Sequence, residues 1–188
     1  MPLDVIIYIV SFIWIVSEIV LARLKHSTSS DVKADNYSLW ILWTTIAISI
    51  VVSESISDNK LGLITAHRFT LALVGLMVIL AGLAIRWIAI YSLRKYFTID
   101  VSIRSDHKIV DTGIYKYVRH PSYSGSLLSF LGLGITTLNW ISGIIIVVPI
   151  MIAFIYRINI EEQVLTTFFG DQYKQYCAAT KRLIPKIY

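Results

Sequence analysis

The sequence contains a single cysteine, Cys177, among 188 residues. One thiol cannot form an internal disulfide, and it cannot build a cysteine-based metal cluster. The four histidines, His26, His67, His107 and His120, do not have the spacing typical of metal ligands. We therefore expect no structural metal.

Charged residues are also scarce. They make up 15% of the chain, whereas hydrophobic residues make up 56% and the mean hydropathy is +0.68. A soluble domain of this size cannot bury so much apolar surface in one core, so the composition predicts an integral membrane protein. The net charge of +5 contains no polybasic run, which indicates attraction to anionic lipid headgroups rather than binding of nucleic acid.

Long apolar runs take the place of charge. A hydrocarbon core about 30 Å thick needs about 20 apolar residues in a helix. The first three such segments are Leu3 to Ala22, Leu39 to Ser57 and Phe69 to Leu93. The first segment lacks the basic start of a signal peptide, and its apolar run is longer than that of a signal peptide. We therefore expect it to be retained as a membrane helix.

A shorter pair of apolar segments follows. Ser124 to Leu138 would be about 22 Å long as a helix, and Asn139-Trp140 then turns the chain into Ile141 to Tyr156. We expect these segments to form a tight helical hairpin, which either crosses the bilayer or lies partly below one face. The predicted fold is an all-α integral membrane protein with about five transmembrane helices.

Basic residues are concentrated on one side of this expected topology. Lys and Arg accumulate in cytoplasmic segments of membrane proteins. The first loop, the long loop after the third helix and the C-terminal tail contain all of them except Lys60, Arg68 and Arg86. We therefore expect a multi-pass protein whose N-terminus lies outside and whose C-terminus and polar motifs face the cytoplasm.

The chain divides into two parts, residues 1–93 with three membrane helices and residues 94–188 with the polar motifs. In the second part, Thr98 to Ile103 alternates polar and apolar residues, and Lys108 to Val110 is again extended after a turn. This pattern predicts a small cytoplasmic β-hairpin-like loop on the membrane surface.

The last part of the chain has helical periodicity. Aromatic and apolar residues from Leu165 to Cys177 fall at helical spacing, with an interruption at Gly170-Asp171. They predict an amphipathic C-terminal helix at the membrane interface. The segment Thr180 to Pro185 leaves this helix and is expected to fold back as a lid.

The first polar motif, Arg-His-Pro-Ser-Tyr-Ser-Gly, extends from Arg119 to Gly125. Pro121 excludes His120 from helical geometry, and Ser122 is placed to start a helix. A histidine and free backbone N–H groups therefore meet at a helix N-terminus, where anionic groups are favoured. The motif suits a ligand site, or a helix cap with Tyr123 as an interfacial anchor.

The second polar motif is Arg157-Ile-Asn-Ile-Glu-Glu162. Arg157 and Glu161 share one helix face, and Glu162 points about 100° away. This arrangement suits the binding of an anion and a cation, or an i,i+4 ion pair that eases the exit of a helix from the bilayer. Glu18 and Arg86, near the cytoplasmic ends of two other helices, are expected to snorkel or to pair with each other.

The combination of these motifs resembles the isoprenylcysteine carboxyl methyltransferase family, including its small prokaryotic members and the related phospholipid methyltransferases. The resemblance covers the C-terminal half from Tyr96 and rests on Gly113-Ile-Tyr115, Tyr117 to Gly125, Glu161-Glu162, Leu165, Phe169-Gly170, Tyr173, Tyr176 and Arg182 to Pro185. It implies a carboxyl O-methyltransferase that uses S-adenosylmethionine. It also implies a donor pocket facing the cytoplasm and a lipophilic or prenylated-cysteine acceptor that enters from the bilayer.

The resemblance also implies roles for individual residues. Arg157 would hold the acceptor's carboxylate, and Glu161 would fix the guanidinium. His120 would bind the carboxylate end of the donor, and Glu162 its ammonium or ribose. The remaining donor-binding residues implied are Lys116, Val118, Tyr123, Gly125, Leu183 and Ile184. A carboxylate acceptor is ionised at pH 7, so positioning and exclusion of water rather than a strong base would accelerate the transfer.

Three other functions are compatible with the sequence. A lipid amine methyltransferase would use the same donor site and would need a base, for which Glu161 is available. An NADPH-dependent sterol reductase resembles the chain in its C-terminal half, although such reductases are usually longer. A structural membrane subunit would leave both polar motifs without a role. In each case membrane lipid is the expected surrounding, with no obligate protein partner.

Overall fold

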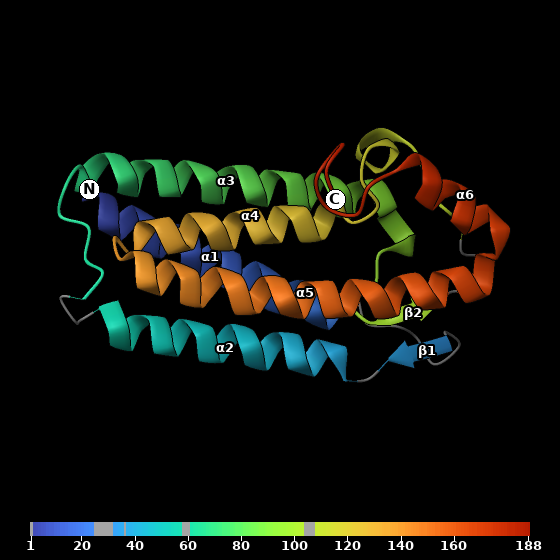
Figure 1. Cartoon of the computed structure of the whole chain (residues 1–188), viewed down its shortest axis with the longest axis horizontal. Coiled ribbons are helices and arrows are strands. Elements are labelled where there is room, and N and C mark those ends of the chain that lie inside the picture. Colours follow the sequence, from blue (N-terminus) through green and yellow to red (C-terminus); the bar gives the residue numbers. More distant parts are fainter. Residues whose placement is uncertain (1, 25–31, 36, 58–60, 104–107) are drawn as a thin grey trace.

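The apolar segments form long helices that run side by side along one direction (Figure 1). The computed structural model describes residues 2–24, 32–35, 37–57, 61–103 and 108–188. Its α-helices are α1 (Leu3–Leu24), α2 (Ser38–Ser57), α3 (Arg68–Leu93), α4 (Pro121–Thr136), α5 (Trp140–Phe169) and α6 (Asp171–Ala179). Between them lie the 3₁₀ helices η1 (Arg94–Tyr96) and η2 (Gly113–Lys116) and the strands β1 (Val32–Asp35) and β2 (Val101–Ile103).

Four of these helices, α1, α2, α3 and α5, are long and apolar enough to cross a membrane. The 16 residues of α4 span about 24 Å, less than the hydrocarbon core of about 30 Å. All five apolar segments expected from the sequence are therefore helical, and the integral membrane fold is confirmed. The fifth was expected to end at Tyr156, but α5 is 30 residues long and ends at Phe169. The second polar motif therefore lies within an unbroken helix.

The turn between α4 and α5 is held by Asn139. Its side-chain oxygen accepts hydrogen bonds from the backbone N–H groups of Ile141 and Ser142, and its Nδ2 donates to the carbonyl of Leu61 at 2.8 Å. Asn139 therefore caps α5 and fastens the turn to the segment between α2 and α3. The expected helical hairpin and its turning point are confirmed.

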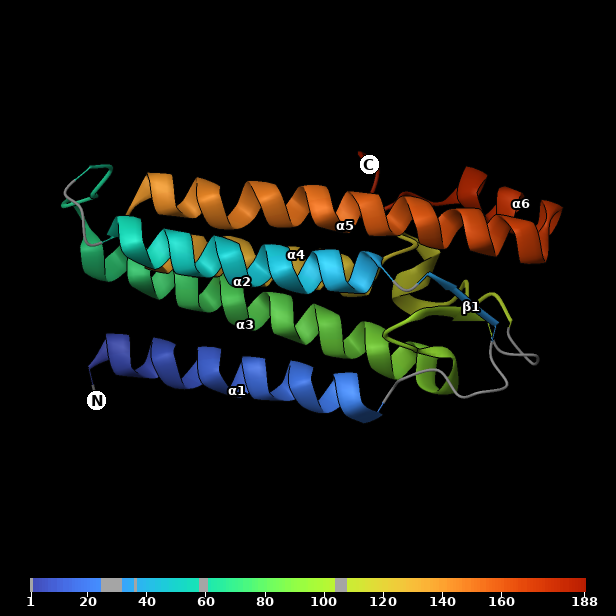
Figure 2. The same ribbon diagram turned by 90° about the horizontal axis from the view of Figure 1, so that it is seen from below.

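Small residues bring the helices together. A Cβ added at Gly125 of α4 would lie 2.6 Å from the backbone N of Arg86 and the carbonyl oxygen of Gly82, so α3 and α4 are in backbone contact. On the other side α2 packs on α5, where Ser142 Oγ donates to the carbonyl of Ser53 at 3.0 Å. Helix α1 lies beside α3, at one side of the bundle (Figure 2). Its Trp14 packs on Phe130 of α4.

The prediction of a β-hairpin-like loop is wrong in its pairing. Strand β2 pairs antiparallel with β1, which belongs to the first loop, and residues 108–110 form no strand. The predicted turn at residues 104–107 lies outside the described residues. Both loops emerge at the same end of the bundle (Figure 1), and Arg157 donates to Ser38 beside one loop and to the carbonyl of Ile99 in the other. A strand from the first loop is thus held next to β2.

The C-terminal segment folds back onto the bundle as expected. Gly170, with φ of +57°, separates α5 from α6. After α6, the backbone N–H of Arg119 donates to the carbonyl of Lys181 at 2.8 Å, and that of His120 donates to Arg182 at 3.0 Å. The segment after Ala179 therefore lies against the start of α4, where the first polar motif is found.

Candidate functional site

A cavity of about 230 Å³ extends along the inside of the bundle and joins both polar motifs. We distinguish three parts by their lining residues. The membrane arm is lined by Ser11, Trp14, Ile15, Leu39, Leu42, Trp43, Ile46, Ile50, Phe130, Leu133 and Phe154. The polar waist consists of Glu18, Arg86, His120, Ser122, Tyr123, Arg157 and Glu161. The aromatic arm is lined by Tyr96 to Asp100, Lys108 to Val110, Tyr115, Phe169, Tyr173 and Tyr176.

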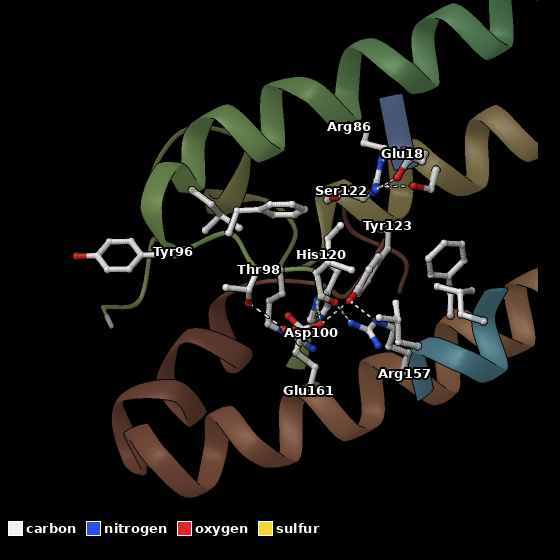
Figure 3. Close-up of a pocket in the computed structure, with 18 of the residues that line it drawn as sticks. Glu18, Arg86, Tyr96, Thr98, Asp100, His120, Ser122, Tyr123, Arg157 and Glu161 are labelled. Atoms are coloured by element: carbon white, nitrogen blue, oxygen red, sulfur yellow. Dashed lines mark hydrogen bonds and ion pairs between the residues drawn. The ribbon is translucent and has the colours of Figure 1, made fainter. Parts of the chain in front are cut away.

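Tyr123 connects the catalytic residues that the sequence predicted. Its hydroxyl accepts a hydrogen bond from Arg157 Nε at 3.0 Å and donates one to Glu161 Oε2 at 2.8 Å (Figure 3). The geometry thus differs from a direct i,i+4 ion pair, because a phenol from α4 lies between the two charged groups. Helices α4 and α5 are linked at the waist by this contact.

Arg157 is held by groups from two further parts of the chain. Its side chain is buried, and Nη1 donates to Ser38 Oγ at 2.8 Å, while Nη2 donates to the carbonyl of Ile99. A guanidinium has five N–H donors. The hydrogen bonds to Tyr123, Ser38 and Ile99 use three of them. Among the described residues, the other two N–H donors have no hydrogen-bond partner.

His120 lies between the two adjacent carboxylates of α5. Its ring stacks on Tyr123 with the centroids 5.6 Å apart. Its Nε2 lies 3.2 Å from Glu162 Oε1, and its Nδ1 lies 3.9 Å from Glu161 Oε2. His120 is 5% exposed, so its ring has a fixed position at the wall of the cavity.

Glu162 occupies a different environment from Glu161. Its carboxylate accepts hydrogen bonds from Arg119 Nε at 2.7 Å and from Arg182 Nε at 2.9 Å, in addition to the contact with His120. Glu162 does not line the cavity but faces a groove on the other side of α5. Arg119 also donates to the carbonyls of Cys177 and Thr180, so this buried cluster fastens the C-terminal segment to α4 and α5.

An ion pair forms the side of the waist that faces the membrane arm. Arg86 of α3 donates through Nε and Nη2 to both carboxylate oxygens of Glu18 on α1. Its Nη1 donates to Ser122 Oγ at 2.8 Å (Figure 3). The mutual pairing of Glu18 and Arg86 expected from the sequence is therefore confirmed.

Two tyrosines of the aromatic arm are hydrogen-bonded to the backbone. The Tyr115 hydroxyl donates to the carbonyl of Ala89 at 3.3 Å, and the Tyr176 hydroxyl donates to the carbonyl of Tyr115 at 2.8 Å. Burial raises the pKa of Tyr115 and of Tyr173 far above its usual range, so both phenols are neutral at physiological pH. Such walls suit a flat aromatic ligand group.

The structure separates the eight predicted donor-binding residues. His120 and Tyr123 line the cavity, whereas Gly125 contacts α3 and Glu162 belongs to the buried cluster. The backbone of Val118 pairs with Lys181. Leu183 is buried, while Lys116 and Ile184 are exposed.

Sequence reasoning missed several residues of the aromatic arm. Lys108 to Val110 had appeared only as an extended segment, and Tyr173 and Tyr176 only as part of the amphipathic C-terminal helix. Tyr115 and these two tyrosines belong to the motifs that carry the family resemblance, which was the available signal. In the part of the chain that the structure describes, no three His, Cys, Asp or Glu side chains are grouped to hold a metal ion.

Known proteins are similar to this chain in sequence and in fold. The family model described as phospholipid methyltransferase matches residues 70–172. Protein-S-isoprenylcysteine O-methyltransferase B of Arabidopsis thaliana is 34% identical over 172 residues, which cover 90% of this chain and 86% of that protein. The enzyme of the same name from Rattus norvegicus is 32% identical over 155 residues, which cover 81% of this chain and 50% of its own length.

A solved structure gives the same assignment. The eukaryotic intramembrane Ras methyltransferase, an isoprenylcysteine carboxyl methyltransferase, superposes with a TM-score of 0.66 at 31% identity. The match covers 81% of this chain and 55% of that chain. Similarity over 90% of the chain also corrects the expectation that the resemblance is confined to the C-terminal half.

Proposed function

We propose that this chain methylates the carboxylate of a prenylated cysteine or a similar lipophilic acceptor. The chain belongs to the isoprenylcysteine carboxyl methyltransferase family. The observation that carries the proposal is the shape of the cavity. An apolar arm at membrane depth and an aromatic arm at the other end meet at a charged waist. Two ligands of unlike polarity can therefore meet there.

The aromatic arm is the proposed site of S-adenosylmethionine, which supplies an electrophilic methyl group on a sulfonium. The neutral phenols and ring faces of Tyr115 and Tyr173 suit the adenosyl group. His120, at the helix N-terminus of α4, suits the donor's carboxylate.

Glu161 is a better candidate than Glu162 for the donor's ammonium group. The carboxylate of Glu162 is already neutralised by Arg119 and Arg182, and it faces away from the cavity. Glu161 lines the cavity, and among the described residues only Tyr123 donates a hydrogen bond to it. Its carboxylate therefore keeps acceptor capacity for a cation, and the family-based role of Glu162 becomes that of holding the C-terminal segment.

Arg157 is proposed to hold the acceptor's carboxylate. It lies where the two arms meet, and its position is fixed by Tyr123, Ser38 and Ile99. Two of its N–H donors have no partner among the described residues. An ionised carboxylate needs no base, so fixed alignment with the donor is the main requirement. The tail of the acceptor would occupy the membrane arm.

Access to the membrane arm is proposed to be lateral, between α1 and α2. Both helices line this arm, and α1 packs mainly on α3 rather than on α2. The distribution of Lys and Arg supports a cytoplasmic position for the aromatic arm and the C-terminus. Residues 94–188 would form the methyltransferase core, and residues 1–93 would supply most of the acceptor's surroundings.

Binding and transfer assays on the detergent-purified protein test the proposal. We expect micromolar binding of S-adenosylhomocysteine in calorimetry and methyl transfer to N-acetyl-S-farnesylcysteine. A phospholipid amine is the second acceptor to test, because the matching family model is that of phospholipid methyltransferases and Glu161 is available as a base. Transfer to the amine and not to the prenylcysteine would refute the carboxylate assignment. NADPH binding in place of S-adenosylhomocysteine would refute the methyltransferase assignment.

A further inference from the structure

The membrane arm has a definite end. Its deepest lining residues are Ile50 of α2, Leu133 of α4 and Ser11 of α1. One turn beyond Ile50, the carbonyl of Ser53 accepts a hydrogen bond from Ser142 of α5, which brings α2 and α5 together. The arm therefore stops where the helices close on each other.

The same closure occurs between α4 and α5. One residue beyond Leu133, a Cβ added at Gly134 would lie 3.1 Å from the Cα of Gly143. At such a close approach of two backbones there is no space for a ligand chain. The wall at Ile50 and Leu133 is thus formed by side chains that are backed by helix contacts.

The length of the arm can be measured along two helices. Ser38 Oγ contacts Arg157, and Ile50 follows 12 residues later, about 18 Å along α2 at 1.5 Å per residue. Ser122 Oγ contacts Arg86, and Leu133 follows 11 residues later, about 16 Å along α4. Both helices give a similar depth from the waist to the end of the arm.

This depth can be compared with extended S-prenylcysteines. With bond lengths of about 1.5 Å, an extended chain advances about 1.25 Å per bond. From the carboxyl carbon to the end of the tail, geranyl, farnesyl and geranylgeranyl cysteines are then about 14, 19 and 24 Å long. The arm matches the farnesyl compound and is about one isoprene unit too short for the geranylgeranyl compound.

We propose that Ile50, backed by the contact of α2 with α5, sets the maximum tail length of the acceptor at about three isoprene units. This inference rests on the proposed function, because it takes the acceptor's carboxylate to lie at Arg157. Longer tails must bend or leave part of their apolar surface outside the protein, and the burial of that part no longer contributes to binding.

The test is a comparison of kcat/KM for the three N-acetyl-S-prenylcysteines in four proteins. In the wild type we expect kcat/KM for the farnesyl compound to exceed that for the geranylgeranyl compound by at least tenfold. Ile50→Trp moves the end wall toward the waist. It is expected to lower kcat/KM for the farnesyl compound at least tenfold relative to that for the geranyl compound. Ile50→Ala is expected to raise kcat/KM for the geranylgeranyl compound relative to that for the farnesyl compound.

The control is Ile48→Trp, because Ile48 lies on the same helix with 63% of its surface exposed and does not line the cavity. It should keep the ranking of the wild type. Binding of S-adenosylhomocysteine verifies that each variant is folded, and Ile50→Phe replaces the tryptophan variant if that variant does not bind.

Two outcomes separate the inference from the function on which it rests. The same ranking of the three acceptors in the wild type and in all Ile50 variants would overturn the length limit alone. If folded protein binds S-adenosylhomocysteine but methylates none of the three, the proposed acceptor class is wrong, and the length limit is wrong with it.

Discussion

Glu161 and Glu162 are neighbours in α5, but their carboxylates lie on different sides of the helix and have different partners. Glu161 lines the cavity and accepts a hydrogen bond from Tyr123, whereas Glu162 binds Arg119 and Arg182 and lines the groove on the other side of α5. A helix places consecutive residues about 100° apart, so one carboxylate can serve a ligand while the other holds the C-terminal segment. This division of roles can be tested directly.

The variants Glu161→Gln and Glu162→Gln should change different properties, ligand affinity in the first and stability in the second. Loss of the Glu161 charge is expected to weaken binding of S-adenosylhomocysteine by about tenfold or more, with an unchanged melting temperature. Loss of the Glu162 charge leaves Arg119 and Arg182 without a buried counter-charge, so the melting temperature should fall. Calorimetry and thermal unfolding measure both quantities. Equal loss of ligand affinity without loss of stability in the two variants would refute the division.

The link through Tyr123 should matter for turnover more than for donor binding. Arg157→Ala is expected to lower kcat far more than the affinity for S-adenosylhomocysteine, because Arg157 is assigned to the acceptor. Tyr123→Phe removes the hydroxyl between Arg157 and Glu161 and should lower kcat by a smaller factor. Tyr156→Phe, on the exposed face of α5, is the matched control. If Arg157→Ala reduces both quantities equally, the acceptor assignment is wrong.

The ion pair between Glu18 and Arg86 should contribute to stability. Both side chains are largely buried, with 14% and 10% of their surface exposed. Removing one partner of a buried pair leaves an uncompensated charge, so Glu18→Gln is expected to lower the free energy of unfolding by about 3 kcal/mol. Glu54→Gln, at an exposed position of α2, should have no effect. Unfolding in detergent measures the difference, and equal stability of the two variants contradicts the prediction.

The contact between α3 and α4 should not tolerate a side chain at Gly125. An added Cβ would meet the backbone of α3 at 2.6 Å, so Gly125→Ala is expected to destabilise the protein by about 1–3 kcal/mol. At Gly143 the nearest atom would lie 3.4 Å away, an ordinary contact, so Gly143→Ala serves as the control. A large loss of donor affinity with unchanged stability in Gly125→Ala would instead support the donor-binding role that the sequence suggested.

Much of the fold was predictable because membrane solvent leaves few choices. Backbone groups in hydrocarbon must be satisfied within helices, and apolar runs of sufficient length therefore mark the helices. The turn at Asn139 was also predictable, since a short polar residue between two apolar segments can cap the following helix. The pairing of β1 with β2 was not, because it joins loops that are far apart in the sequence.

The sequence by itself determined the membrane-embedded helices, the two polar motifs and the family, since composition, local spacing and motif identity are properties of the chain alone. Tertiary structure decided which side chains of these motifs share a cavity. Glu161 and Glu162 are equivalent as residue types, and Gly125 lies inside a motif that suggests a ligand. Only the packing of α4 on α3 and the position of the C-terminal segment give Gly125 and Glu162 structural partners and leave Glu161 facing the cavity. Such contacts depend on the arrangement of whole helices, and local sequence does not encode that arrangement.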